Sequence, residues 1–80
     1  MPWSPLLYKK EILTDILSEM IDGKISTDQL FKIIMKRTLM VGTRSIKTTI
    51  KALETLGYIK LRGDGWFEVN VELCEKELLS

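Results

Sequence analysis

The chain contains no histidine and only one cysteine, Cys74, among its 80 residues. The absence of histidine removes the usual general base, the familiar catalytic triads and most transition-metal sites. A single cysteine excludes an intramolecular disulfide and a cysteine-based zinc site, and we expect Cys74 to be a small buried hydrophobic residue. There is also no glycine-rich phosphate-binding loop. We therefore expect a protein that is not an enzyme and that holds no metal and no cofactor.

Long hydrophobic runs are absent too, and none approaches the ~20 residues that span a bilayer. No signal-peptide pattern is present at the start of the chain, so we expect no membrane association and a cytoplasmic location. With 45% hydrophobic residues, residues 1–80 should form one globular domain. A chain this short buries only about 60% of its unfolded surface. A thin core is expected, and pairing with a second copy would add to it.

Net charge is nearly balanced at +1, but its distribution along the chain is uneven. Residues 1–31 carry −2, residues 32–62 carry +7 and residues 63–80 carry −4. A basic block of this kind is the electrostatic signature of a surface that binds a polyanion. The alternative is chance clustering in a short chain.

The stretch VGTRSIKTTIKALETL, residues 41–56, has the strongest helical periodicity. Its apolar residues recur at steps of four and three and form one stripe: Ile46, Ile50, Leu53 and Leu56. Gly42 or Thr43 can serve as the N-cap, and Gly57 suits the position just after the helix. We predict a helix over residues 43–56.

The opposite face of this helix is cationic and hydroxyl-bearing, with Arg44, Lys47, Thr48, Lys51 and Thr55. Such a face suits the major groove of DNA. Arg pairs bidentately with guanine, Lys reaches phosphate or guanine, and Thr bonds phosphate or touches a thymine methyl. The competing interpretation is an ordinary solvated surface helix.

Two further helices are predicted before it. The first, over residues 5–22, has Ser4 as N-cap and Gly23 as its end. Its inner side should include Leu13, Ile16 and Ile21, while Tyr8 and Ile12 widen the apolar surface as core or as a dimer contact. The second covers residues 27–37, where Ser26 and Gln29 form a capping box. Lys24-Ile25 between them is expected to form no more than a bridge of strand.

After Gly57 the period changes to two, in residues 58–62 and again in residues 66–71. A three-residue loop, Gly63-Asp64-Gly65, places Leu61 opposite Phe67 and Ile59 opposite Val69. It also places Lys60 opposite Glu68 and Arg62 opposite Trp66. Because a two-residue loop would oppose Leu61 and Glu68, we predict the three-residue hairpin, with the αL position at Gly65.

Residues 72–80 form a short, acidic, amphipathic tail, with Cys74 and Leu78 at helical spacing. A brief helix is expected there, packing on the core or on another copy.

The segment from Ile25 to Val71 resembles a winged helix-turn-helix domain of the kind found in small prokaryotic, archaeal or viral transcription regulators. The similarity lies in VGTRSIKTTIKALETLGYIKLRGDGWFEV, which matches the pattern of capped recognition helix, Leu-Glu, Gly, aromatic residue, Ile and wing. The stretch between Ile34 and Gly42 is several residues longer than the family's usual tight turn. The resemblance implies an α+β, mainly α fold of three helices, a two-stranded wing over residues 58–71 and a short C-terminal helix.

The resemblance also implies a sequence-specific, nucleoid-associated regulator that binds double-stranded DNA. The third helix would enter the major groove, and the wing would touch the backbone or the minor groove. The implied DNA contacts are Lys36, Arg37, Thr43, Arg44, Ser45, Lys47, Thr48, Lys51, Lys60 and Arg62. Trp66 would brace Arg62 through a cation–π contact or simply pack on the strand. A homodimer through the terminal helices is expected, and a protein- or RNA-binding module is the alternative.

Overall fold

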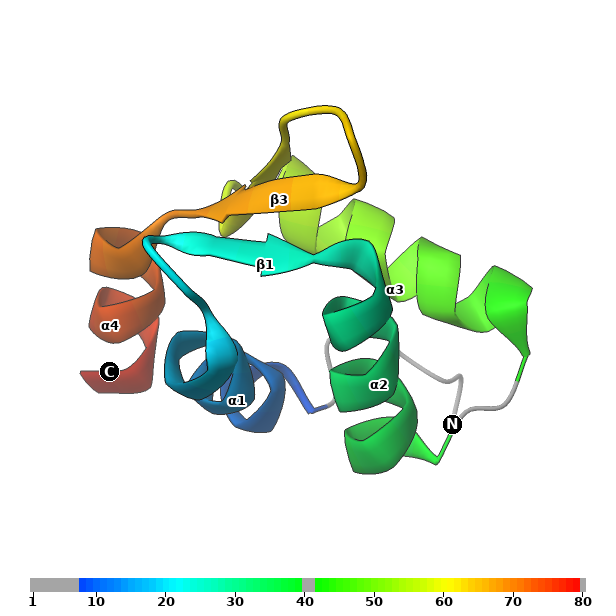
Figure 1. Cartoon of the computed structure of the whole chain (residues 1–80). Helices are drawn as coiled ribbons and strands as arrows, with labels where there is room; N and C mark the ends of the chain where they lie inside the picture. Colours follow the sequence, from blue (N-terminus) through cyan, green and yellow to red (C-terminus); the bar gives the residue numbers. More distant parts are fainter. Residues whose placement is uncertain (1–7, 40–41, 80) are drawn as a thin grey trace.

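The computed structural model describes residues 8–39 and 42–79 of the chain. These residues form four helices and one antiparallel sheet of three strands (Figure 1). In chain order the elements are α1 (Lys9–Glu19), β1 (Lys24–Ser26), α2 (Thr27–Thr38), α3 (Thr43–Thr55), β2 (Ile59–Leu61), β3 (Trp66–Val69) and α4 (Val71–Leu79). The class is α+β and mainly helical, as expected. The predicted Ser4 cap and the residue Val41 lie outside the described residues.

One hydrophobic core joins all the elements. The sheet covers one side of it, α1 and α2 lie beneath the sheet in Figure 1, and α3 lies behind it. The fully or nearly buried side chains are Ile12, Leu13, Ile16, Ile25, Leu30, Ile33, Ile34, Ile46, Ile50, Leu53, Tyr58, Ile59, Phe67, Val69 and Cys74. Ile12 is fully buried, so it belongs to the core and not to a dimer contact. Cys74 is buried as predicted, and burial raises the pKa of its thiol to about 11.

The first helix ends earlier than predicted. α1 stops at Glu19, and Met20 already has an extended backbone. Ile21 and Lys24 then pair through two backbone hydrogen bonds of 2.8 and 3.0 Å, around Asp22 and Gly23. Both turn residues have positive φ, 54° and 75°, which an Asp-Gly pair adopts readily in a two-residue turn. The expected helix end at residue 22 is therefore wrong. Ile21, expected inside, is 69% exposed.

The sheet has one strand more than predicted. β1 pairs with β3 over three residues, with Ile25 opposite Phe67, and gives the strand order β1-β3-β2. The expected bridge at Lys24-Ile25 is thus a full edge strand, and the expected two-stranded hairpin is part of a larger sheet. Two buried side chains facing inward, Ile25 and Phe67, explain why so short a strand is retained.

The register of the hairpin is confirmed. Ile59 lies opposite Val69, Lys60 opposite Glu68 and Leu61 opposite Phe67. Gly65 has the predicted positive φ, at 74°. Its carbonyl accepts hydrogen bonds from the Thr27 backbone N–H (2.8 Å) and from Thr27 Oγ1 (2.9 Å). The tip of the hairpin is therefore fastened to the first residue of α2. The strands are shorter than residues 58–71 suggested, because Val71 already begins α4.

α2 and α3 begin at capping residues that the sequence predicted. α2 has Ser26 as N-cap, and its Oγ accepts the Gln29 backbone N–H at 3.1 Å. The Gln29 side chain donates to Glu19 rather than back to Ser26. α3 begins after Gly42 and ends at Thr55, and Gly57 has a φ of +90°. Leu56, expected on the buried stripe, lies beyond the last turn and is 46% exposed.

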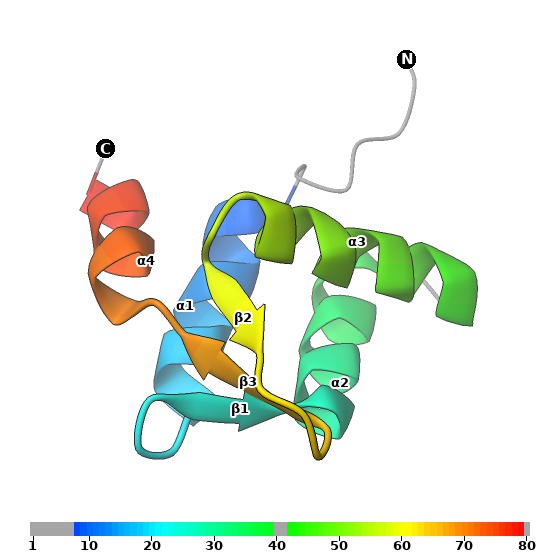
Figure 2. The ribbon, with the colours of Figure 1, turned by 90° about the horizontal axis from the view of Figure 1, so that it is seen from above.

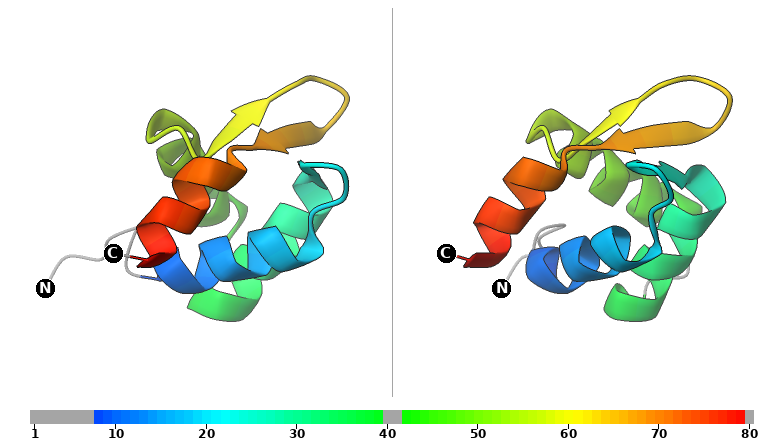
Figure 3. Two further views of the ribbon diagram at one scale, coloured as in Figure 1. Left: turned by 90° about the vertical axis from the view of Figure 1, so that its left-hand side faces the viewer. Right: turned by 60° about the vertical axis from the view of Figure 1, so that its left-hand side comes forward.

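The tail forms α4, which packs on α1, as seen in Figure 3. Asn70 Oδ1 accepts the Leu73 backbone N–H at its start. Lys9 of α1 pairs with Glu77 of α4 at 3.1 Å, and Glu77 also accepts the Tyr58 hydroxyl. The tail thus packs on this chain's own core. The expected dimer through the terminal helices stays a prediction.

The cap of α2 is testable by mutation. We expect Ser26→Ala to lower the free energy of unfolding by about 1 kcal/mol, because the Gln29 N–H loses its acceptor. Chemical denaturation measures the change. The matched control is Ser18→Ala on the exposed side of α1, where alanine should be neutral or slightly stabilising. Equal stability of Ser26→Ala and wild type would contradict the role given to this cap.

Candidate nucleic-acid interface

The solvent face of α3 brings most of the predicted contact residues together. Arg44, Lys47 and Lys51 follow at steps of three and four, so they share one side of the helix, and all three are exposed. Between residues 44 and 51 the helix rises about 10 Å. Thr43, Arg44, Lys47, Thr48 and Lys51 together line an open hollow along this side. The opposite side of α3 holds Ile46, Ile50 and Leu53 in the core, which fixes the outward direction of the cations.

These three cations are electrostatically unneutralised. Within residues 8–39 and 42–79, no acidic side chain lies within ion-pair distance of Arg44, Lys47 or Lys51. Like charges spaced along one helix face repel one another and lower the stability of the helix. No ion pair in the described residues offsets this repulsion. The face therefore carries a concentrated positive charge that is available to an external anion, and the one acidic residue of α3 is Glu54, three residues after Lys51.

The hydroxyl-bearing residues of α3 differ in their hydrogen-bond partners and in their burial. Thr48 Oγ1 donates to the Arg44 carbonyl at 2.9 Å, so its proton is engaged, and its side chain is exposed. Thr49 Oγ1 donates to the Ser45 carbonyl at 3.0 Å, and its side chain is fully buried. Thr49 was not predicted as part of the buried face. Its position three residues after Ile46 and four before Leu53 was the signal. Thr43 and Ser45 are exposed at the start of the helix.

Lys36 and Arg37, the two residues of α2 predicted to contact DNA, differ in their surroundings. Lys36 is exposed. The guanidinium of Arg37 turns instead toward α1 and makes a bidentate pair with Asp15, at 2.6 and 2.8 Å. The hydrogen bonds from Arg37 hold the pKa of the Asp15 carboxyl below its usual range. Asp15 and Arg37 are 22 residues apart, so sequence spacing gave no sign of this pair. Arg37 braces α1 against α2.

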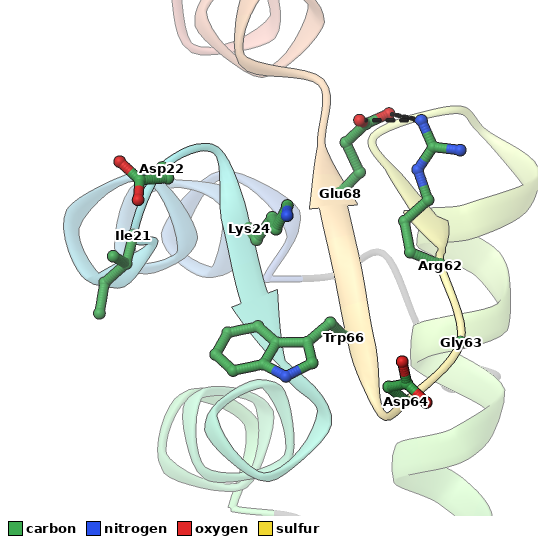
Figure 4. Close-up of a pocket in the computed structure, with 8 residues that line it drawn as sticks. All are labelled: Ile21, Asp22, Lys24, Arg62, Gly63, Asp64, Trp66 and Glu68. Atoms are coloured by element: carbon green, nitrogen blue, oxygen red, sulfur yellow. Dashed lines mark hydrogen bonds and ion pairs between the residues drawn. The ribbon is translucent and has the colours of Figure 1, made fainter.

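The predicted contacts on the hairpin lie on the outer face of the sheet. Lys60 is exposed opposite Glu68. Arg62 Nη2 reaches both carboxylate oxygens of Glu68 at 3.0 Å. Figure 4 shows the guanidinium directed at Glu68, while the Trp66 ring lies on the other side of β3, across β1. Trp66 thus packs on the neighbouring strand, and the partner of Arg62 is Glu68.

Comparison with known proteins identifies no relative: no protein-family model, no curated protein and no solved structure matches this chain. Among the described residues, no helix is both long enough and apolar enough to cross a membrane.

The Asp15–Arg37 pair generates a pH dependence. Because the folded pKa of Asp15 is depressed, its stabilisation is present above the unfolded value of about 3.9 and is lost as the pH falls through the folded pKa. We expect Asp15→Asn to be less stable than wild type at neutral pH and to lose less stability on acidification below about pH 4. Thermal melts from pH 7 to pH 2 measure the difference.

The control is Asp64→Asn at the exposed hairpin tip, where asparagine tolerates the positive φ. This variant should follow the wild-type acid profile. If Asp15→Asn and wild type lose stability to the same extent on acidification, protonation of the Asp15 carboxylate is not what destabilises the wild type.

Proposed function

We propose that this protein is a winged helix-turn-helix regulator of transcription that binds double-stranded DNA in a sequence-specific manner. In this proposal α3 lies in the major groove, and the β2–β3 hairpin is the wing on the backbone or in the minor groove. The observation that carries the proposal is the face of α3, where three exposed cations within two helical turns have no acidic partner in the described chain.

The arrangement of the elements supports the proposal. The order helix, strand, helix, helix, hairpin is compatible with a winged-helix layout. Figure 2 shows that the C-terminal end of α3 adjoins the sheet, whereas the N-terminal part of α3 extends past the edge of the sheet. Its N-terminal half, with Arg44 and Lys47, is therefore accessible to a groove about 12 Å wide.

The chemistry of the individual side chains assigns them different roles. Arg44, in the first turn, can bond guanine O6 and N7 with two parallel N–H groups. Lys47 and Lys51 supply charge to phosphates on either side. Thr48 is exposed and its hydroxyl proton is engaged by the Arg44 carbonyl, so its methyl group suits contact with a thymine methyl group.

On the hairpin, Arg62 can bind a phosphate only after it leaves Glu68. Both members of the Arg62–Glu68 pair are about half exposed, with side chains 50% and 46% accessible. Exposed pairs of this kind contribute at most about 1 kcal/mol. A phosphate can therefore replace Glu68 as the partner of Arg62 at a small cost in free energy. Lys60 forms no ion pair within the described residues and can bind a phosphate directly. Arg37, held by Asp15, is assigned to the fold and not to DNA.

Salt dependence tests the electrostatic part of the proposal. We expect duplex affinity to fall steeply with salt, and Lys51→Ala to reduce the slope of log K against log [salt] by about one unit. Fluorescence anisotropy with a labelled duplex measures both. Lys76→Ala removes one charge from the exposed side of α4 and should leave the slope unchanged. A flat salt response of the wild type would exclude the proposal.

Base readout is a separate prediction. Arg44→Lys keeps the charge but loses the bidentate geometry, so it should retain non-specific affinity and lose about 1–3 kcal/mol of discrimination at one base pair. Selection from a random duplex pool gives the site, and binding to its single-base variants gives the discrimination. Identical preferences of wild type and Arg44→Lys would show that Arg44 does not read a base.

A further inference from the structure

Tyr58 lies between the end of α3 and the start of β2, and it hydrogen-bonds to both α3 and α4. Its backbone N–H donates to the Leu53 carbonyl at 3.1 Å and closes the last turn of α3. Its carbonyl accepts the Asn70 backbone N–H at 2.9 Å, and the Cys74 thiol lies 3.9 Å from the same oxygen. Its hydroxyl donates to Glu77 at 3.2 Å. One buried residue therefore links the end of α3 to three successive turns at and within α4.

The Glu77 carboxylate is held in place from α1. Lys9 Nζ lies 3.1 Å from this carboxylate and 5.8 Å from the centre of the Tyr58 ring, so the three side chains form one cluster. The hydrogen bond from Lys9 lowers the pKa of the Glu77 carboxyl and raises the pKa of the Lys9 ammonium, so both are charged at neutral pH. A charged acceptor makes the bond from the Tyr58 hydroxyl stronger than a bond between neutral groups.

Leu73 of α4 covers Gly57, the residue before Tyr58. A Cβ atom added to Gly57 would lie 3.5 Å from Leu73 Cδ2, which is ordinary van der Waals contact. α4 thus holds both of the residues, Gly57 and Tyr58, through which the cap of α3 continues into β2.

These contacts act at the end of α3 that is remote from Arg44. Figure 2 shows α4 and the N-terminal part of α3 on opposite sides of the molecule. Between residues 44 and 55 the helix rises about 16 Å, so a change of about 5° in its direction at the Tyr58 end moves Arg44 by about 1.5 Å. A binding side chain must lie within about 0.5 Å of its productive position. The bonds at Tyr58 therefore affect base readout without making a contact to DNA.

We propose that Glu77 is a positioning residue for DNA recognition, because through Tyr58 it fixes the direction of α3 relative to the hairpin. This role rests on the DNA-binding function proposed above and extends it to α4, which carries none of the predicted DNA contacts. Electrostatics alone has the opposite effect, since removal of an acidic residue strengthens binding to a polyanion. A loss of affinity when this carboxylate is removed therefore reports positioning and not charge.

The test compares Glu77→Ala with Glu75→Ala, a matched control that removes the same charge from the exposed side of the same helix. The probes are the duplex selected from the random pool and a duplex of unrelated sequence. Glu77→Ala should lower affinity for the selected duplex by up to about five-fold, the factor that corresponds to one hydrogen bond. Its affinity for the unrelated duplex should not fall, and Glu75→Ala should lose affinity for neither. Circular dichroism verifies that each variant is folded.

Two further variants isolate the bond between Tyr58 and Glu77. Glu77→Gln keeps an acceptor for the hydroxyl and should recover most of the affinity for the selected duplex. Tyr58→Phe removes the donor and should lower that affinity as Glu77→Ala does, and the double variant should bind no more weakly than Glu77→Ala alone. Additive losses, or equal binding of the selected duplex by Glu77→Ala and Glu75→Ala, would overturn the proposal.

A readout without DNA separates this proposal from the proposed function. Amide hydrogen exchange in the free protein should be faster at Tyr58 and Asn70 in Glu77→Ala than in wild type, and unchanged at Ile34 in the middle of α2. Unchanged exchange at Tyr58 and Asn70 would refute the positioning role even where wild type binds duplex DNA. Faster exchange at these amides in a protein that binds no duplex would refute the DNA-binding function, and the positioning role with it.

Discussion

The burial of one side of α3 is the constraint on which the rest of the arrangement depends. Ile46, Ile50 and Leu53 lie in the core together with Thr49, whose hydroxyl is satisfied within the helix. Rotating α3 by one residue would expose these side chains and bury a lysine or an arginine without a partner, at a cost of several kcal/mol. The fold therefore fixes which way Arg44, Lys47 and Lys51 point. Their common direction is a consequence of packing.

Two long-range contacts join α2 to its neighbours. Thr27 fastens the hairpin tip to α2 through the Gly65 carbonyl, and Asp15 fastens α1 to α2 through Arg37. The hairpin is thus held to α2 at its tip, and β2, which carries Lys60, also packs against α3. Rigid placement of this kind favours recognition of a shaped surface, because little conformational entropy is lost on binding.

Much of the fold was predictable from local pattern. The helical period of residues 43–56, the Ser26 cap and the pairing of Leu61 with Phe67 are local or nearest-neighbour effects, and each was predicted correctly in kind. The end of α1 was missed because Gly23 fits both a helix end and a two-residue turn, and pairing between Ile21 and Lys24 decides for the turn. β1 was underestimated because its partner, β3, lies some forty residues further along the chain.

The candidate site was predictable to the extent that it lies on one helix. Spacing alone places Arg44, Lys47, Thr48 and Lys51 on one face. The spacing of residues within one helix could not show that Arg37 pairs with Asp15 or that Arg62 pairs with Glu68, because each ion pair joins two different segments of the chain. Ile21 illustrates the same limit. Its exposure follows from the early end of α1.

The most direct measurement is a backbone amide NMR titration of the full chain with duplex DNA at low salt. We expect chemical-shift changes to concentrate on residues 43–51 and on the strand that carries Lys60, with α4 unaffected. Changes confined to α4 or to the outer face of the sheet, or no changes at all, would contradict the claim that the cationic side of α3 is the surface that meets DNA.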